Sequence, residues 1–415
     1  MELTTIVLAI AAAAGLYMAW NIGANDVANA MGTSVGSGAL TLRGAIIVAA
    51  IFEFGGAMLV GGTVTQTIRQ GIVDVGAFGS DPLIIAVGMT CCLIAAAIWL
   101  NIATYAGWPV STTHSIVGAV VGFGLVAGGF DAVHWSVMGK IVASWVVSPL
   151  LGGLLGYFGF GFIKRRILNA DRPLLALRGW GPILVFPIFA ILTLSALFKG
   201  LKPLKLDLAL GPSVGIAVAI GLSASMASVP LLRNFAKRAA KDKRDRTYHA
   251  ERVFQVLQIL TACFVAFAHG SNDVANAVGP MAAVFGATSG QIGADVAVPY
   301  RVLLIGAVGI VIGLATYGYK IMATVGKKIT ELTPSRGFAA EFGAATTIVL
   351  ASKLGLPVST THTLVGAVIG VGFARGIGAI NTRVVNGIVA SWFITVPFTA
   401  ILAAGLFLIG RIWLP

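Results

Sequence analysis

Charged residues are scarce in this sequence. Only 10% of its 415 residues are Asp, Glu, Lys or Arg, whereas a soluble domain carries about 25%. Hydrophobic residues make up 57% of the chain, and apolar runs close to the roughly 20 residues that span a bilayer recur from end to end. This composition excludes a soluble enzyme and predicts an all-α polytopic membrane protein.

Cysteine and acidic residues are also rare. The three cysteines lie in apolar segments, and their spacing fits no metal site, so we expect neither a transition metal nor a cofactor. The 28 Lys and Arg residues exceed the 15 acidic residues and give a net charge of +13. Because these basic residues fall mostly in short loops, they indicate cytoplasmic loops rather than a nucleic-acid partner.

One of the few carboxylates within an apolar run belongs to Asp26. It lies in the stretch Gly-Ala-Asn-Asp-Val-Ala-Asn-Ala at 23–30, which recurs at 270–277 with Ser replacing the first Ala. A charge in a membrane segment is costly and is usually kept for function. The leading glycine permits non-helical backbone, so we expect a broken first helix in each copy.

A second motif, Pro-Val-Ser-Thr-Thr-His, begins at Pro109 and again at Pro357. The two motifs recur at nearly the same separation, since 272 − 25 is 247 and 357 − 109 is 248. The sequence therefore predicts an internal duplication. Residues 1–166 form the first repeat, 167–248 a central two-helix segment with a cytoplasmic loop, and 249–415 the second repeat.

Proline at the second motif ends one helix and starts another. We therefore expect re-entrant hairpins over 82–128 and 338–378, the alternative being a full span at 82–104. The hairpin arrangement places every basic cluster in the cytoplasm and both termini outside, and it gives the two repeats inverted topology. The remaining predicted spans are 4–37, 44–67, 134–163, 180–198, 211–231, 252–286, 299–325 and 384–411.

Inverted hairpins bring their tips together at the middle of the membrane. Each tip is a helix N-terminus with free backbone N–H groups and three hydroxyls, an arrangement that typically binds phosphate. The predicted anion ligands are Ser111, Thr112, Thr113, Ser359, Thr360 and Thr361.

The repeated Asn-Asp stretch instead offers carboxylate and amide oxygens, which suit a hard cation such as Na⁺. The predicted cation ligands are Asn25, Asp26, Asn29, Asn272, Asp273 and Asn276. Neither motif contains Lys or Arg, so bound cations or protons must balance two carboxylates and an anion. The charge count predicts cation-coupled anion symport, with Na⁺ favoured and H⁺ as the alternative.

Four further polar residues lie in apolar surroundings and are secondary candidates: Glu53, His269, Glu341 and Lys353. The two glutamates do not align between the repeats, so we expect each to serve a separate cation or a structural role. His269 either packs or handles a proton. Lys353 either neutralises the anion or pairs with Glu341.

Both motifs, together with Ile51-Phe52-Glu53 and His269, resemble the inorganic phosphate transporter (PiT) family of sodium- or proton-coupled phosphate symporters. The likeness covers both repeats. It implies paired inverted repeats, a central phosphate site, ions held at the duplicated Asn-Asp, and a place in the cell (inner) membrane. The short loop 233–246 is similar to that of prokaryotic members, and relatives proposed to carry sulfate make that anion an alternative.

Two other classes of function are weaker. An intramembrane hydrolase could use Ser111 as nucleophile and His114 as base, but nothing explains why both residues should be duplicated in inverted repeats. An anion channel conflicts with buried carboxylates, which repel a freely conducted anion. We therefore expect a carrier and not an enzyme, for which a homodimer is compatible with the sequence but not required by it.

Overall fold

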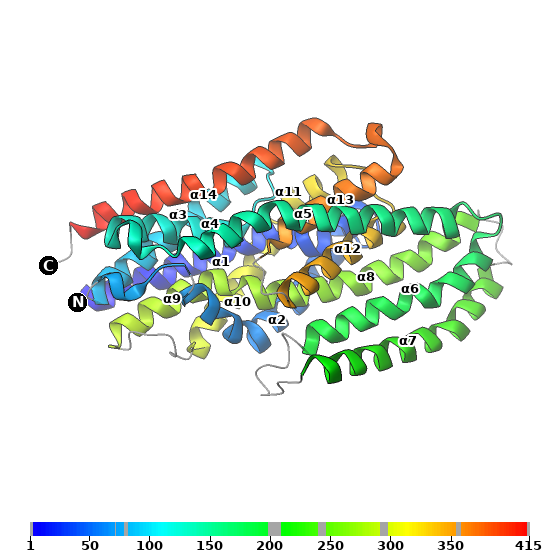
Figure 1. The fold of residues 1–415 in the computed structure, drawn as a ribbon, viewed down its shortest axis with the longest axis horizontal. Helices are drawn as coiled ribbons and strands as arrows, with labels where there is room; N and C mark the ends of the chain where they lie inside the picture. The colour runs from blue at the N-terminus through cyan, green and yellow to red at the C-terminus, as the bar shows by residue number, and fades with distance from the viewer. Residues whose placement is uncertain are drawn as a thin grey trace.

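The computed structural model describes residues 3–70, 72–78, 82–197, 209–239, 246–290, 298–353 and 358–412. These residues form an elongated helical molecule in which most helices lie along the long axis (Figure 1). Among them, the isolated bridge between Val73 and Val133 is the only strand-type pairing.

The described helices fall into two halves around a central pair. The first half contains α1 (Leu3–Gly36), α2 (Leu42–Gln70), α3 (Pro82–Ala106), α4 (Thr112–Gly128) and α5 (Trp135–Ile163), and the central pair is α6 (Pro173–Ser195) and α7 (Leu210–Ala239). The second half contains α8 (Arg246–Asp273), α9 (Ala275–Thr288), α10 (Tyr300–Thr316), α11 (Tyr319–Ala323), α12 (Pro334–Lys353), α13 (Thr360–Arg375) and α14 (Thr382–Arg411). Short 3₁₀ or π turns are η1 (Val75–Phe78), η2 (Phe130–Ala132), η3 (Lys164–Leu168), η6 (Thr324–Lys328) and η7 (Ile377–Ala379).

Eight of the described helices are long and apolar enough to cross a membrane, or nine if the bent α10–α11 pair is one span. The predicted spans and hairpins lie on described helices, so the prediction of an all-α polytopic membrane protein is confirmed. Pro82–Ala106 alone is also long and apolar enough to span a membrane, so the re-entrant hairpins stay a prediction. The span predicted at 299–325 is not straight, because its two parts meet at 54°.

The break expected at Gly23 is wrong for the first copy, since α1 is helical from Leu3 to Gly36. Gly23 serves close packing instead. A Cβ atom there would lie 2.0 Å from the Ile310 carbonyl oxygen on α10, which only glycine avoids. In the second copy α8 ends at Asp273 and α9 begins at Ala275, but Val274 between them keeps helical dihedral angles and Thr247–Thr288 is one candidate span, so no break lies at Gly270 either. The glycine there, Gly270, likewise faces the Glu53 carbonyl oxygen of α2, at 2.1 Å from a built Cβ.

The helices α3 and α4 form hairpin 1, and α12 and α13 form hairpin 2. The two hairpins lie toward opposite ends of the long axis (Figure 1). Each packs against the last helix of the other half, since α5 contacts α12 and α13 while α14 contacts α3 and α4. Trp392 on α14 stabilises this packing, because its indole N–H donates to the Pro109 carbonyl at 3.0 Å. The two halves of the sequence therefore pack against each other at the centre of the molecule.

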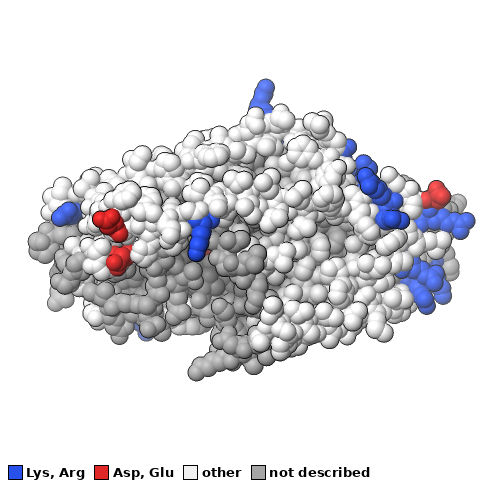
Figure 2. Space-filling view, viewed as in Figure 1, with Lys and Arg blue, Asp and Glu red and all other residues white. Residues whose placement is uncertain are grey.

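Charge is distributed unevenly along the long axis. Lys and Arg gather at one end, where η3 carries Arg165 and Arg166 and α7 ends with Lys237 and Arg238 (Figure 2). The first described turn of α1 and the end of α14 lie at the opposite end (Figure 1).

Candidate functional site

Three carboxylates surround one imidazole at the centre of the molecule. His269 Nε2 lies 2.9 Å from Asp273 Oδ2 and 3.6 Å from Asp26 Oδ2. His269 Nδ1 lies 3.3 Å from Glu53 Oε1. All four side chains are at most 2% exposed, so this cluster joins α1, α2 and α8 away from solvent.

This cluster corrects the expectation that Glu53 serves a cation separate from the Asn-Asp stretches, and its alternative structural role stays a prediction. The sequence could not reveal the contact, because it depends on the close packing of α2 against α8 at glycines such as Gly56 and Gly270. Ligand atoms of Asp26, His269 and Asp273 all lie within 4.8 Å of one another, a spacing that suits a metal ion. Asn29 Oδ1 and Glu53 Oε2 are buried and accept no hydrogen bond from the described residues, and Glu53 Oε1 faces His269 Nδ1. The centre thus has more oxygen acceptors than donors, as a site for a hard cation requires.

Both hairpin tips reach this cluster through threonine hydroxyls. Thr112 Oγ1, at the first residue of α4, donates to Asp26 Oδ2 at 2.6 Å. Thr361 Oγ1, from α13, donates to the other oxygen of Asp26 at 3.1 Å. Thr360 Oγ1 lies 3.4 Å from Asp273 Oδ2. The predicted anion residues and the predicted cation residues therefore form one continuous polar centre.

The outer asparagine of each Asn-Asp stretch bonds the tip of the opposite hairpin. Asn29 Nδ2 donates to Thr361 Oγ1 at 2.8 Å. Asn276 Nδ2 lies 3.2 Å from the hydroxyls of both Thr112 and Thr113. The structure thus brings threonines from both tips together with asparagines from both stretches.

Ser111 and Ser359 cap the two hairpin helices, and their predicted contact with the anion stays a prediction. Each is the N-cap of its hairpin helix and accepts the backbone N–H of His114 or His362, at 3.2 Å in both cases. Capping of this kind stabilises the first turn. The imidazole of His114 lies against Trp145 and His362, with ring centroids 5.0 and 4.7 Å away. Ser111 is therefore not paired with an imidazole base, which removes the geometric support for a hydrolase.

Glu341 lies in a separate polar cluster and ties α12 to two other helices. Its Oε1 accepts hydrogen bonds from Thr33 and Ser34 of α1 and from Gln258 of α8. Its Oε2 accepts a bond from Thr261 of α8 at 2.5 Å. These four donors are not among the predicted site residues, because nothing in the sequence distinguishes them from the other hydroxyl and amide residues of α1 and α8.

The predicted pairing of Glu341 with Lys353 is wrong. Both residues are on α12 and are twelve positions apart, which separates them by about 18 Å along the helix. The carboxylate is instead satisfied by its four donors. The side chain of Lys353 lies outside the described residues, so its other predicted role, neutralising the anion, stays a prediction.

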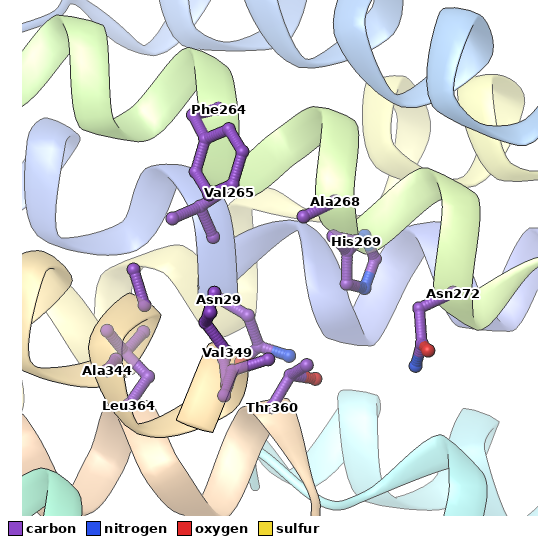
Figure 3. Close-up of a pocket in the computed structure, with 12 residues that line it drawn as sticks. Asn29, Phe264, Val265, Ala268, His269, Asn272, Ala344, Val349, Thr360 and Leu364 are labelled. Atoms are coloured by element: carbon purple, nitrogen blue, oxygen red, sulfur yellow. The ribbon is translucent and has the colours of Figure 1, made fainter. Parts of the chain in front are cut away.

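A cavity of about 30 Å³ opens beside the centre, between α8, α12 and α13. Its polar wall is formed by Asn29, His269, Asn272 and Thr360 (Figure 3). Its remaining wall is apolar and is formed by Phe264, Val265, Ala268, Ala344, Ala345, Ile348, Val349 and Leu364. The volume is sufficient for water, and the cavity borders both polar groups of the centre and apolar side chains of α12.

Comparison with known proteins agrees over nearly the whole chain. Residues 22–403 match the model of the phosphate transporter family. The chain is 47% identical over 410 residues to "Inorganic phosphate transporter 2-1, chloroplastic" of Arabidopsis thaliana, covering 94% of this chain and 70% of that protein. It is 46% identical over 405 residues to a Haemophilus influenzae protein whose name assigns it to the phosphate permeases, covering 97% and 96%. A solved structure, "The sodium-dependent phosphate transporter", matches 99% of this chain and 100% of its own, with a TM-score of 0.87 and 45% identity.

Proposed function

Because this chain belongs to the phosphate transporter family, we propose that it carries inorganic phosphate across the cell membrane together with Na⁺. Members of this family are transporters rather than enzymes. The likeness to a sodium-dependent phosphate transporter supports Na⁺ as the coupling ion. The alternatives to Na⁺-coupled phosphate transport are proton coupling and transport of sulfate, both by a protein of the same fold.

The observation that carries this proposal is the excess of negative charge at the centre. Asp26, Glu53 and Asp273 share one histidine, and no Lys or Arg of the described residues pairs with Asp26 or Glu53. Even a charged imidazole therefore leaves two negative charges before the anion binds. Such charge is too costly in a buried site without compensation. Bound Na⁺ supplies it, with Asp26, Asp273 and the free oxygen of Asn29 as the ligands that we favour.

The anion is expected at the two threonine tips. The N-termini of α4 and α13 both face the centre, and each carries the positive end of a helix dipole and unsatisfied N–H groups. The hydroxyls of Thr112, Thr113, Thr360 and Thr361 then supply hydrogen bonds to phosphate, while Ser111 and Ser359 hold the tips in shape. Because Thr112 and Thr361 also bond Asp26, the anion and the cation stabilise one another.

The arrangement of the hairpins supports transport by alternating exposure. We infer that the two halves are inverted repeats, since hairpins of like sequence approach the centre from opposite ends (Figure 1). With the basic end in the cytoplasm, as positive residues in short loops favour, both termini lie outside.

Uptake of labelled phosphate into proteoliposomes tests the function. An inward Na⁺ gradient and an inward proton gradient are imposed separately, and we expect the Na⁺ gradient alone to drive accumulation. Exchange of labelled for unlabelled phosphate in the absence of gradients distinguishes a carrier from a channel. Phosphate uptake that follows only the pH gradient contradicts Na⁺ coupling, and uptake of sulfate in its place contradicts the proposed substrate.

A further inference from the structure

The two threonine hydroxyls that contact Asp26 have already donated their protons. Thr112 Oγ1 lies 2.6 Å from Asp26 Oδ2. Thr361 Oγ1 lies 3.1 Å from Asp26 Oδ1 and 3.3 Å from the Val110 carbonyl oxygen. A carboxylate and a carbonyl oxygen only accept hydrogen bonds, and a threonine hydroxyl has a single proton. In both contacts the threonine is therefore the donor, and its proton is not available to another partner.

Two asparagine amides determine the direction of bonding on the other side of these hydroxyls. Asn29 Nδ2 lies 3.1 Å from Asp26 Oδ1 and 2.8 Å from Thr361 Oγ1. Because the carboxylate must accept, the nitrogen of this amide faces both atoms, and Thr361 accepts a hydrogen bond from it. Asn276 Nδ2 lies 3.2 Å from Thr112 Oγ1. Since Thr112 gives its proton to Asp26, it likewise accepts from the amide.

Each of these two hydroxyl oxygens has one bonding position left, and that position is an acceptor. A threonine oxygen offers one proton and two lone pairs. In Thr112 and in Thr361 the carboxylate takes the proton and an amide takes one lone pair. The second lone pair remains. Both side chains are at most 2% exposed, so these lone pairs lie in the buried centre and not in solvent.

The donors at the tips come from other groups. The first N–H groups of α4 and α13 have no acceptor within their own helices. Thr113 Oγ1 accepts from Asn276 Nδ2 at 3.2 Å, and among the described residues no carboxylate takes its proton. An anion at the tips therefore meets donors from the backbone and from Thr113, and acceptors from Thr112 and Thr361.

Phosphate and sulfate differ in their ability to use such acceptors. Both are tetrahedral anions of similar size, but phosphate at neutral pH keeps at least one P–OH group, whereas sulfate carries no proton. A site that offers only donors binds both anions. A site that also presents lone pairs accepts the P–OH group, but it places a sulfate oxygen against a lone pair unless a threonine breaks its bond to Asp26. A buried polar group that the wrong ligand leaves unpaired is a strong basis for discrimination.

We propose that Thr112 and Thr361 select phosphate over sulfate by accepting a hydrogen bond from the P–OH group, because both donate their own protons to Asp26. The inference rests on the proposed function, in which the anion binds at the threonine tips. It narrows the substrate class to tetrahedral oxyanions that carry a hydroxyl hydrogen. It also gives Asp26 a role beyond holding a cation, since this carboxylate sets the direction of the hydrogen bonds around the anion.

Displacement of labelled phosphate from the purified chain in Na⁺ buffer tests the selection. Unlabelled phosphate, arsenate, sulfate and selenate are compared as competitors. Arsenate and selenate are larger than phosphate and sulfate, and only phosphate and arsenate carry hydroxyl hydrogens, so the set separates size from protonation. Arsenate is expected to displace phosphate nearly as well as phosphate itself. Sulfate and selenate are expected to need concentrations about tenfold to a hundredfold higher, as the loss of one hydrogen bond to a charged group implies.

Valine variants assign the selection to particular hydroxyls. Thr112→Val and Thr361→Val each remove one acceptor, so each is expected to weaken phosphate binding about tenfold while sulfate binding is unchanged or improved. Thr113→Val is the matched control, because it removes a neighbouring hydroxyl that acts as a donor. It is expected to weaken both anions alike and to leave their ratio unchanged. Thr112→Ser and Thr361→Ser keep the hydroxyl and are expected to keep the wild-type ratio, whereas a merely structural role would change the binding of both anions equally.

Binding is measured without transport, so the selection and the proposed function can fail separately. Equal displacement by sulfate and phosphate in the wild type overturns the selection and leaves phosphate transport as proposed. A ratio that falls as much in Thr113→Val as in Thr112→Val also overturns it. Absence of phosphate binding in Na⁺ buffer and at acidic pH contradicts both the selection and the proposed function. The comparison of the anions on the wild type needs no variant and carries the test if a valine variant does not fold.

Discussion

Thr361 of hairpin 2 donates its hydroxyl to Asp26 of α1 at 3.1 Å, across 335 positions of the sequence. Thr112 of hairpin 1 bonds the other oxygen of the same carboxylate. The Asp26 carboxylate therefore accepts a hydrogen bond from each hairpin tip. With the anion at the tips and a cation at Asp26, as proposed, the binding of each ligand would influence the other, as coupling between two ligands requires.

Replacing Thr112 or Thr360 by valine tests the role of the tips. Each change keeps the side-chain shape and removes one hydroxyl, so the half-saturating phosphate concentration is expected to rise at least several-fold. Thr112→Ser and Thr360→Ser retain the hydroxyl and serve as controls with nearly unchanged affinity. Initial uptake rates over a range of phosphate concentrations provide the measurement. Unchanged affinity in both valine variants removes these residues from the anion site.

Glu53 and His269 are expected to act as a pair. Glu53→Gln and His269→Gln each remove one side of a buried ion pair, and each single change should weaken Na⁺-dependent uptake strongly. The double variant should lose less than the sum of the two, with a coupling of about 1 kcal/mol or more. The half-saturating Na⁺ concentration in all four combinations measures this coupling. Strictly additive effects contradict a direct interaction.

Glu341 is expected to support the structure of hairpin 2. Glu341→Leu leaves the hydroxyls of Thr33 and Ser34 without their acceptor in a buried site, and each donor without an acceptor costs about 1–3 kcal/mol. Thermal unfolding of the purified protein should therefore shift downward by several degrees, whereas Glu341→Gln keeps an acceptor and should shift much less. Equal melting temperatures for the two variants would show that the carboxylate oxygens do not anchor α12.

The sequence predicted the helices well, because apolar length and proline positions depend on local physics. It also identified the duplicated residues at the centre. It missed features that depend on contacts between distant helices. The bend between α10 and α11 and the approach of Glu53 to His269 are examples. The helix break predicted at Gly23 is wrong for the same reason. Glycine permits both a helix break and a close helix–helix contact, and only the position of Ile310 decides between them.

The predicted orientation can be checked with cysteine labelling from one side of the membrane. Single cysteines in the predicted loops 68–81 and 200–209 are expected to react with an impermeant reagent from outside. Cysteines at 167–178, 232–248 and 326–337 are expected to react from the cytoplasm only. If a position within 68–81 and one within 326–337 are labelled from the same side, the inverted arrangement is incorrect.

Movement of Na⁺ driven by phosphate tests the central claim most directly. Proteoliposomes are prepared with equal Na⁺ on both sides and an inward phosphate gradient, and entry of radioactive Na⁺ is followed. The wild-type chain is expected to accumulate Na⁺ above equilibrium, because Asp26 and Asp273 must be occupied by cations as phosphate passes. The Asp26→Asn, Asp273→Asn double variant should show no such accumulation. Phosphate entry that leaves Na⁺ at equilibrium in the wild type, or full Na⁺ accumulation in the double variant, contradicts the account.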